Sequence, residues 1–447
     1  MKVGFAKVDI TPRLGVEMAG FGPFVHRIAR DLRDRLWARA MAASDGDRRW
    51  VLISAELVGV DAPIVRKVRE LLAEWTSLAP AEVMCHATHT HSGPAVLSET
   101  IGWGEPDLPY LLRLPSLLAA AGREALGNLQ DVTLSTATFP VNGVAYNREQ
   151  DERPAYDDAM RDNWRPALPE HTDTAGRVIC AAAAGRLTGF LAHYSCHPVV
   201  CCEQTHSLHG DYCGVAMHAL EDEHPGAVGM FLQGAHADIN TCVCHMPQAE
   251  SMRALDVIAE RFARGVRTGI GQAQPLAGDS VAAVSEELTI RRAGVSADDL
   301  RQRVRDNVQA LLSDAAGDAG RDARMAAIGL TAARRSLARL EANGSLDEVS
   351  EAQALRLGEV LIFGLPLELF RGVGRHVQRA VGREPMLVLS NANGALGYAV
   401  TRRCYQEKGP RHYARDIVPR IHGSAAFRED LEDDLVDACV KLAGQIA

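Results

Sequence analysis

Short apolar runs alternate along the chain with longer segments in which apolar residues recur every three or four positions. The short runs are rich in Val, Ile, Leu and Met and end at Gly, Pro or polar loops, which is typical of buried strands. The longer segments have the spacing of amphipathic helices. We expect strands over residues 36–42, 50–57, 177–183, 188–195, 228–232, 357–366 and 386–390. We expect helices over residues 61–75, 108–128, 207–223, 248–269 and 424–443.

The alternation of these elements predicts an α/β fold, with a mixed β-sheet core flanked by helices. A chain of 447 residues is long enough for a closed core, and a single domain over residues 1–447 is the simplest partition. Within it, residues 296–341 predict an exterior pair of antiparallel helices. The polar stretch 149–175 is long for a loop in a compact chain, and a substrate-covering flap and a mobile surface loop are equally good interpretations of it.

Charge and composition exclude several classes of function. The net charge is −9, from 48 basic and 57 acidic residues, which disfavours a nucleic-acid partner. No apolar run approaches the roughly 18 residues that a membrane span needs. Aromatic residues make up only 5% of the chain, and no basic amphipathic segment suits stable membrane association. The first residues lack the apolar core of a signal peptide, which predicts a cytoplasmic protein.

Ten cysteines occur in the chain, and reduced thiols are the default interpretation in a long chain without a leader. The run 193–209 combines several histidines with three cysteines, so it could hold a second metal ion. Free thiols around a single functional histidine are the favoured alternative. The pair Cys242 and Cys244 leaves the same choice open.

The segment 83–94 reads Val-Met-Cys-His-Ala-Thr-His-Thr-His-Ser-Gly-Pro and predicts a strand that runs into a loop. Because alternate residues of a strand share a face, His89 and His91 are expected on one side and His86 on the other. Two imidazoles at a strand end can act as two metal ligands, or as one ligand and one proton-transfer group. Two ordinary polar histidines in a loop are the alternative.

Other predicted strands also end in polar side chains that suit a metal site. These side chains are His197, Asp238, Asn240, Glu368 and Tyr398. Mixed α/β folds gather their sites at strand ends that are followed by helices. Zinc accepts nitrogen and oxygen ligands and keeps a position for water in catalytic sites. The pattern is therefore compatible with one zinc site built from distant parts of the chain, and ordinary histidines among the 16 of the sequence are the alternative.

The motifs around these positions resemble, in order, those of the neutral (non-lysosomal) ceramidases. Ala87-Thr88-His89-Thr90-His91-Ser92-Gly93-Pro94 is close to the family's Thr-His-Thr-His-Ser-x-Pro. The other similar pieces are Val8-Asp9-Ile10-Thr11-Pro12, Trp37-Ala38-Arg39-Ala40, Asn147-Arg148, His197-Pro198, Gly364-Leu365-Pro366-Leu367-Glu368 and Gly397-Tyr398-Ala399-Val400-Thr401. The resemblance covers essentially the whole chain. It implies the family's catalytic-domain fold without its C-terminal immunoglobulin-like domain.

The resemblance also implies a role for each site residue. The implied ligands of one Zn²⁺ per chain are His89, His197, Glu368 and Tyr398. His91 becomes the proton shuttle beside the metal, because a neighbouring imidazole can take a proton from water and return it to a leaving amine. Arg148 becomes the contact for the substrate carbonyl or oxyanion.

Three further residues are expected around this centre. A metal-binding histidine needs an acceptor for its second ring nitrogen, and Asp211 or Asp238 is expected to supply it for His89. Asn240 stands where the family places a serine near the substrate, so we expect Asn240 to contact substrate.

Together these features predict a zinc-dependent amidohydrolase that cleaves a linear amide, or N-acyl, bond. The departures from the family's motifs and the lack of a membrane-docking segment favour a small soluble substrate over ceramide. An esterase or lactonase that uses the same site is one alternative, because activated water attacks either carbonyl. A ligand-binding relative without activity is another. A homo-oligomer is compatible with the sequence.

Overall fold

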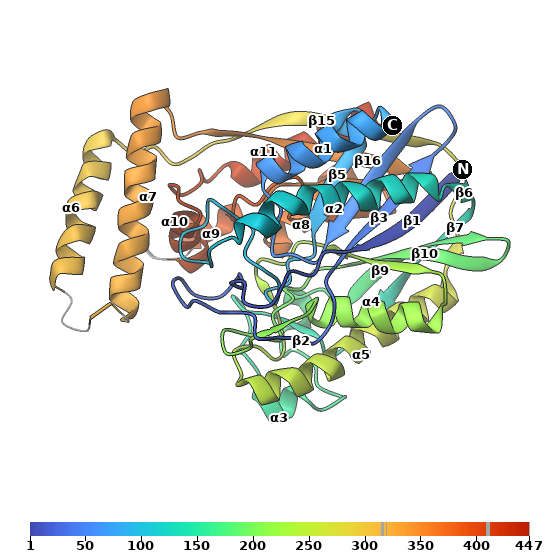
Figure 1. Cartoon of the computed structure of the whole chain (residues 1–447), viewed down its shortest axis with the longest axis horizontal. Coiled ribbons are helices and arrows are strands. Elements are labelled where there is room, and N and C mark those ends of the chain that lie inside the picture. The colour runs from blue at the N-terminus through green and yellow to red at the C-terminus, as the bar shows by residue number, and fades with distance from the viewer. Residues whose placement is uncertain (314–316, 319, 408–411, 447) are drawn as a thin grey trace.

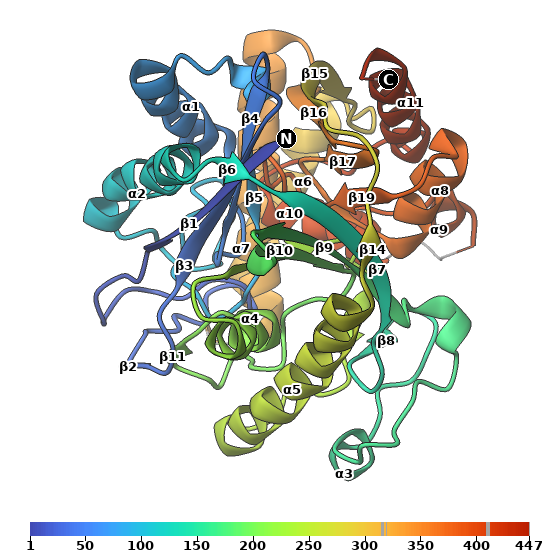
Figure 2. The same cartoon turned by 90° about the vertical axis from the view of Figure 1, so that its right-hand side faces the viewer.

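Three β-sheets with one shared topology meet at the centre of the protein (Figures 1 and 2). The computed structural model describes residues 1–313, 317–318, 320–407 and 412–446. In each sheet three consecutive antiparallel strands are followed by a helix and then by a fourth strand, parallel to the third. A second helix follows the fourth strand. The mixed α/β fold expected from the sequence is therefore confirmed.

The first sheet has the order β5-β4-β3-β1-β6. Its strands are β1 (Lys2–Asp9), β3 (Trp37–Ser44), β4 (Arg49–Ala55), β5 (Val83–Ala87) and β6 (Gln130–Asp131), and its helices are α1 (Ala62–Thr76) and α2 (Leu108–Gly127). Helix α1 begins where the Asp61 side chain accepts a hydrogen bond from the backbone N–H of Ile64, and it ends at Ser77 in the left-handed conformation.

The second sheet has the order β12-β10-β9-β7-β14. Its strands are β7 (Thr133–Pro140), β9 (Ala175–Ala183), β10 (Arg186–Tyr194), β12 (Val228–Gln233) and β14 (Gln274–Pro275), and its helices are α4 (Asp211–Glu223) and α5 (Gln248–Gln272). The predicted hairpin over residues 177–195 is confirmed as β9 and β10.

The third sheet has the order β15-β16-β17-β19. Its strands are β15 (Val281–Ile290), β16 (Glu348–Leu357), β17 (Val360–Gly364) and β19 (Met386–Leu389), and its helices are α8 (Arg371–Val381) and α11 (Leu431–Gln445). Helices α6 (Ala297–Ser313) and α7 (Arg321–Asn343) are inserted between β15 and β16 and project from one end of the molecule (Figure 1). They occupy the segment where the sequence predicts an exterior helix pair.

The inner faces of the three sheets share one apolar core. It contains Phe5, Trp50, Leu191, Met230 and Leu387, all at most 8% exposed. Each sheet packs its outer face against its own helices in a separate apolar cluster. Figure 2 shows the helix pairs α1–α2, α4–α5 and α8–α11 on three different sides of the molecule. Burial of apolar surface on both faces of every sheet fixes how the three sheets are placed relative to one another.

Short elements connect these units. The two-stranded pairs are β2 (Asp31–Leu32) with β11 (Ser207–Leu208), β8 (Ala145–Asn147) with β13 (Ile239–Thr241), and β18 (Glu368–Leu369) with β20 (Tyr398–Ala399). The short helices are η1 (Pro80–Glu82), α3 (Tyr156–Ala159), η2 (Pro169–His171), α9 (Arg402–Glu407), the π-helix η3 (Tyr413–Ile417) and α10 (Val418–Ile421). In the polar stretch 149–175 only α3, η2 and the first residue of β9 are regular. None of the helices in the described ranges is long and apolar enough to cross a bilayer.

The structure corrects the expectation for residues 83–94. Strand β5 ends at Ala87, and His89 has a positive φ of 71°, so the two histidines of the motif lie in a loop beyond the strand. The alternation of a strand therefore does not explain why they lie together. The backbone N–H of His89 is bonded to the carbonyl of Leu57, which anchors this loop beside the end of β4.

Candidate active site

Four buried side chains converge where strands of all three sheets end. His89 follows β5 of the first sheet, His197 and His236 follow β10 and β12 of the second, and Glu368 follows β17 of the third. Each is at most 3% exposed. These four residues could hold a metal ion, because one ligand atom from each lies within 4.8 Å of the others. The common sheet topology thus gathers residues almost 280 positions apart, from 89 to 368, into one site.

The three imidazoles point the same ring nitrogen at one carboxylate oxygen. The Nε2 atoms of His89, His197 and His236 lie 3.0, 3.5 and 3.6 Å from Oε2 of Glu368. The Nε2 atoms of His197 and His236 and Oε2 of Glu368 are buried and have no hydrogen-bond partner among the described residues. Buried polar atoms without partners are costly, and a shared cation at their centre would satisfy all of them.

The opposite nitrogen of each of these rings is held by a backbone carbonyl. Nδ1 of His89 donates to the carbonyl oxygen of Val58 at 2.6 Å. Nδ1 of His197 donates to the carbonyl of His236 at 2.8 Å, and Nδ1 of His236 to that of Gly234 at 2.9 Å. Because a carbonyl only accepts, the proton of each neutral imidazole sits on Nδ1 and the lone pair of Nε2 faces the centre. This arrangement orients three nitrogen ligands before any metal binds.

The electrostatics of the centre favour a neutral set of histidines and an ionised glutamate. Burial lowers the pKa of His197 well below its usual value and that of His236 to about 4. Burial alone would raise the pKa of Glu368, but electrostatic attraction by His89 holds it well below the usual range. Burial therefore favours unprotonated His197 and His236 beside an ionised Glu368, which are the forms that bind cations.

His91 lies beside this group and differs from its members. Its Nε2 is 3.1 Å from Nε2 of His89, but its Nδ1 is buried without a hydrogen-bond partner among the described residues. No backbone carbonyl holds either ring nitrogen of His91. Because Nε2 of His89 can only accept in this arrangement, the contact between the two Nε2 atoms places the proton of neutral His91 on its Nε2 and leaves the lone pair on Nδ1. The ring of Phe21 packs edge-on against it at 4.8 Å between centroids, and Arg27 donates to its backbone carbonyl. Burial lowers the pKa of His91 well below its usual value, which keeps it a neutral base.

Gly20 gives the ring of His91 its space. Gly20 has a φ of +105°, and a Cβ added there would lie 2.5 Å from Nδ1 of His91. We expect Gly20→Ala to displace the His91 ring while leaving the four converging residues in place. The expected result is a metal content equal to that of the wild type with kcat reduced by about tenfold or more. Metal analysis and steady-state kinetics on the same preparation check this, and an unchanged kcat would show that the position of His91 does not matter.

Arg148 and Tyr398 form a second polar pair at the site. Nη2 of Arg148 donates to the hydroxyl of Tyr398 at 2.9 Å and to the carbonyl of Ala237 at 2.6 Å. The guanidinium also lies over the Tyr398 ring, 5.5 Å from its centroid. Strands β18 and β20 pair Glu368 with Tyr398, so the tyrosine is beside the carboxylate. The Arg148 backbone N–H donates to the carbonyl of Asp238 at 2.9 Å, which ties this arginine to the segment that follows β12.

The two aspartates expected behind His89 have other roles, which is a correction. The Val58 carbonyl accepts from His89 instead. Asp238 accepts from the backbone N–H of Arg371 at 2.7 Å and from the Asn147 side chain at 3.0 Å. Asp211 accepts from backbone N–H groups, with the closest at 2.7 Å from Tyr212. Both carboxylates brace the loops that carry the site rather than its imidazoles.

Asn240 lies on β13 beside this segment. Its Nδ2 is 3.8 Å from Sγ of Cys244, and its Oδ1 is buried without a hydrogen-bond partner in the described part of the chain. The predicted contact of Asn240 with substrate stays a prediction.

The buried carboxyl of Asp211 gives a pH-dependent prediction. Burial raises the pKa of this carboxyl to about 6 in the folded protein, compared with about 4 in the unfolded chain. The protonated carboxyl therefore makes its full contribution to stability below about pH 4, and this contribution is lost as the pH rises through about 6. Asp211→Asn keeps an acceptor but has no charge to bury. We expect the free energy of unfolding of the variant, relative to the wild type, to increase by up to about 3 kcal/mol between pH 4 and pH 6. Urea unfolding at several pH values measures this, and a difference that is flat with pH would contradict it.

A second buried group, Cys201, His209 and Asp211, also has its ligand atoms within 4.8 Å of one another. Here the protein itself supplies hydrogen bonds to two of them. Nδ1 of His209 accepts from the backbone N–H of Asp211 at 3.1 Å, and the Asp211 carboxylate accepts from backbone N–H groups. The proton of His209 therefore sits on Nε2, which disfavours Nε2 as a ligand. No disulfide joins the cysteines of the described ranges.

His236 is the member of the site that sequence reasoning missed. The segment after β12 drew attention to Asp238 and Asn240, although His236 precedes both and follows the strand by three residues. The available signal was this position: His197 follows β10 by the same number of residues, and β10 and β12 are parallel neighbours. Carboxyl ends of neighbouring parallel strands lie at the same edge of a sheet.

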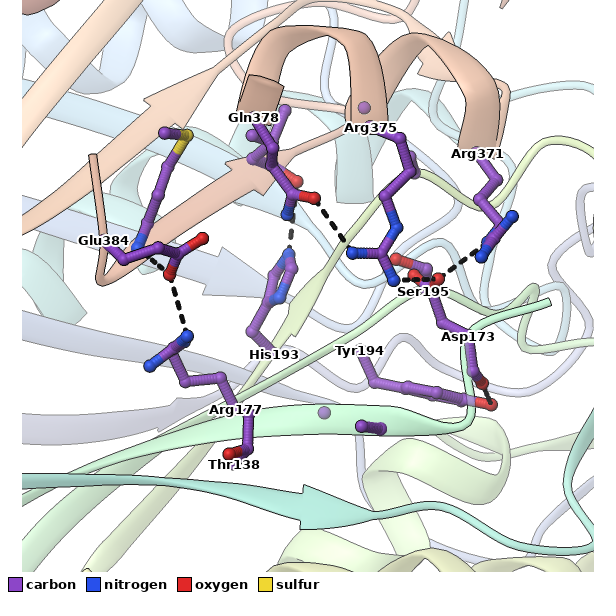
Figure 3. Close-up of a pocket in the computed structure, with 16 residues that line it drawn as sticks. Thr138, Asp173, Arg177, His193, Tyr194, Ser195, Arg371, Arg375, Gln378 and Glu384 are labelled. Atoms are coloured by element: carbon purple, nitrogen blue, oxygen red, sulfur yellow. Dashed lines mark hydrogen bonds and ion pairs between the residues drawn. The ribbon is translucent and has the colours of Figure 1, made fainter. Parts of the chain in front are cut away.

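A polar crevice of about 140 Å³ is lined by residues of β9, β10, α8 and β19 (Figure 3). Arg371 and Arg375 of α8 both donate to Oδ1 of Asp173 at 2.7 Å, and Arg177 pairs with Glu384 at 2.8 Å. The arginines of the crevice are therefore paired with carboxylates. Its lining includes Ala235 but none of the four converging residues, so we do not assign the substrate to it.

The fold and the buried cluster define an α/β protein with a candidate metal centre at the ends of its strands. Residues 1–238 match the sequence profile of the family described as neutral/alkaline non-lysosomal ceramidase, N-terminal. These residues are more than half of the 447-residue chain, and they include all three converging histidines. The chain belongs to this family. The family name denotes hydrolysis of the amide bond of ceramide, so membership implies a hydrolase that acts on a C–N bond other than a peptide bond.

Two solved structures share the fold. The crystal structure of neutral ceramidase from Pseudomonas aeruginosa matches with a TM-score of 0.73 and 19% identity, over 100% of this chain and 75% of that chain. The structure titled "Ceramidase complexed with C2" matches with a TM-score of 0.74 and 18% identity, over 99% of this chain and 74% of that chain. No curated protein sequence matches significantly. The family resemblance and the fold expected from the motifs are thus confirmed.

Proposed function

We propose that this protein is a zinc-dependent amidohydrolase that cleaves a linear amide, or N-acyl, bond. The observation that carries the proposal is the convergence of three carbonyl-anchored imidazoles on the ionised Glu368, with the unanchored His91 3.1 Å from one of them. The donor set of nitrogen and oxygen atoms fits zinc, and the ligands include His89, His197 and Glu368. Membership of the ceramidase family supports the amide bond as the target.

The side chains of the site have separate roles in the proposed amide hydrolysis. A zinc ion held by the cluster would lower the pKa of water towards about 7 and polarise the scissile carbonyl. His91 accepts a proton from the attacking water and returns it to the leaving amine, which must leave protonated. Arg148 places a fixed positive charge where the oxyanion of the tetrahedral intermediate develops. The buried setting excludes bulk water, which strengthens these interactions.

A small soluble amide is the proposed substrate class. The support is the low aromatic content of 5% and the absence of a basic amphipathic docking segment in the sequence. Polar side-chain pairs also lie near Arg148 and Phe21. His412 contacts Glu149 at 2.8 Å, and His245, whose ring is 5.8 Å from that of Phe21, contacts Glu203 at 3.0 Å. A cytoplasmic location, a single domain and a homo-oligomeric state stay predictions.

Removal of the metal is the first test of the proposal. We expect the purified protein to contain about one zinc per chain. Dialysis against a strong chelator should abolish amide hydrolysis, and added Zn²⁺ should restore it. Elemental analysis by mass spectrometry and a hydrolysis assay before and after chelation provide the measurements. A chelated, metal-free protein that remains fully active would rule out the metal-dependent mechanism.

The substrate class is tested by a panel that contains N-acyl amines, N-acyl amino acids, esters, lactones and ceramide. We expect the highest kcat/KM for a soluble N-acyl compound. Faster turnover of esters or lactones than of any amide would support the esterase or lactonase alternative. Ceramide cleavage faster than that of every soluble amide would contradict the proposed substrate class while leaving the metal mechanism intact.

A further inference from the structure

Arg27 is a buried cation that forms no ion pair with the described residues. It lies in the segment between β1 and β2 and is 2% exposed. Burial lowers the pKa of its guanidinium to about 10, so the group stays charged at neutral pH. A buried charge is costly unless hydrogen bonds compensate for the lost water, and Arg27 makes those bonds with backbone carbonyl groups.

These hydrogen bonds tie the loop that carries His91 to two other segments. Nη1 of Arg27 donates to the carbonyl oxygens of Ala19 at 3.1 Å and His91 at 3.0 Å. Its Nε donates to the carbonyl oxygen of Thr205 at 3.2 Å. The guanidinium also lies over the ring of Phe21, 5.1 Å from its centroid. One side chain thus contacts both the backbone of His91 and the aromatic ring that packs against the imidazole.

The His91 ring depends on such contacts because it has few of its own. No backbone carbonyl holds either of its nitrogens, and its backbone N–H reaches the carbonyl of Pro198 only at 3.4 Å. The position of the ring therefore depends on the backbone that carries it and on the neighbouring rings of Phe21 and Trp103, at 4.8 and 6.2 Å between centroids. Arg27 restrains the first and the nearer of the second.

We propose that Arg27 is a positioning residue for proton transfer, which fixes the His91 loop and the Phe21 ring so that the imidazole stays beside the candidate metal centre. This inference rests on the proposed function, in which His91 moves the proton. The hydrogen bonds and the ring contact of Arg27 among the described residues involve none of the four converging side chains. Its effect on turnover therefore passes through His91. A displacement of about 1 Å at a reacting group can lower a rate by about 100-fold.

A double-mutant cycle on kcat tests the inference. The four proteins are the wild type, Arg27→Met, His91→Ala and the double variant, and the zinc content of each is measured. We expect Arg27→Met to lower kcat by about tenfold or more, with KM and zinc content unchanged. In the His91→Ala background the same substitution should lower kcat by less than about twofold, because no imidazole is left to position.

Arg261→Met is the matched control. Arg261 of α5 is also buried, at 4% exposure, and its guanidinium also donates to backbone carbonyls, those of Gly143, Ala159 and Met160. Its removal leaves the same kind of unpartnered carbonyl groups, but away from His91. We expect the folded Arg261→Met protein to keep the kcat of the wild type. A loss of kcat equal to that of Arg27→Met would show a general effect of removing a buried arginine and would overturn the inference.

Two other results would also overturn it: an unchanged kcat of Arg27→Met, or equal losses of kcat from this substitution with and without His91. If Arg27→Met does not fold, Arg27→Lys replaces it in the cycle. Lysine keeps the charge, but its single nitrogen cannot reproduce the separate Nη1 and Nε bonds, so a smaller loss of kcat is expected, again absent in His91→Ala. Full activity of His91→Ala would contradict the proposed role of His91 itself, so the two failures are distinguishable.

Discussion

The variant His91→Ala is expected to keep its zinc and to lose kcat by about 10²–10⁴-fold. The reason is the difference between His91 and its neighbours: the converging histidines have Nδ1 anchored on backbone carbonyls, and His91 does not. Its burial keeps it neutral and able to accept a proton, while its Nε2 is close to the ligand His89. Metal analysis and single-turnover kinetics of the variant measure the two properties separately.

Two comparisons sharpen this experiment. Added imidazole is expected to restore part of the kcat of His91→Ala, because the ring space between Phe21 and Trp103 is vacated. His86→Gln is the matched control, since His86 belongs to the same segment but hydrogen-bonds Ser54 and the backbone of Gln233. It should keep both zinc and kcat. Full activity of His91→Ala would exclude His91 as the proton shuttle.

Arg39→Met is expected to destabilise the folded protein by about 3–5 kcal/mol. Arg39 is buried and forms ion pairs with Glu56 and Glu221, which are buried as well. Removal of the guanidinium leaves Glu56 as a buried carboxylate without its cation, whereas Glu221 keeps Lys7 at 2.7 Å. Glu56 also accepts from the backbone N–H of Trp37 and is adjacent in sequence to Leu57, which binds the His89 backbone.

Arg35→Met is the matched control for this prediction. Arg35 pairs with Asp9 at the surface, where its side chain is 61% exposed. Exposed pairs contribute at most about 1 kcal/mol, because water screens the charges. Denaturant unfolding of both variants at low protein concentration gives the comparison. Equal effects of the two substitutions would show that burial of the Arg39 network does not determine its contribution.

The sequence predicts the helices well because their signals are local. Helix α1 lies within a residue of the predicted boundaries, since the Asp61 cap and the spacing of Ile64, Val65, Val68 and Leu72 are all encoded within the segment itself. The strands with apolar runs, such as β4, β10 and β19, are also found. Strands β15 and β16 are not found, because polar residues interrupt their apolar positions. Strand β15 exposes Ser285, Glu287 and Thr289, and β16 has Glu, Ser, Gln and Arg among its ten residues, so neither strand is one continuous apolar run.

The site is less predictable from the sequence because its geometry depends on backbone carbonyl groups and on how the strands and sheets pack against one another. The acceptor for His89 is the Val58 carbonyl, and every residue has a carbonyl, so no side-chain pattern identifies it. Asp211 and Asp238 are the acceptors that the sequence predicts for His89, yet both carboxylates accept hydrogen bonds from backbone N–H groups. The place of His236 in the site depends on the parallel pairing of β10 and β12, which the sequence does not predict. Motif resemblance located three of the four converging residues, and geometry supplied the fourth.

The meeting of three sheets at one cluster has a consequence for how the protein holds together. An ion bound there would cross-link the three sheets, because His89, His197 and Glu368 each follow a strand of a different sheet. Binding to the assembled form alone stabilises it by mass action, so the metal-loaded protein should unfold as one cooperative body. Without the ion, the buried Nε2 atoms of His197 and His236 and Oε2 of Glu368 have no partner among the described residues, so we expect the metal-free protein to be less stable. Scarcity of zinc would then act on the integrity of the chain as well as on its chemistry.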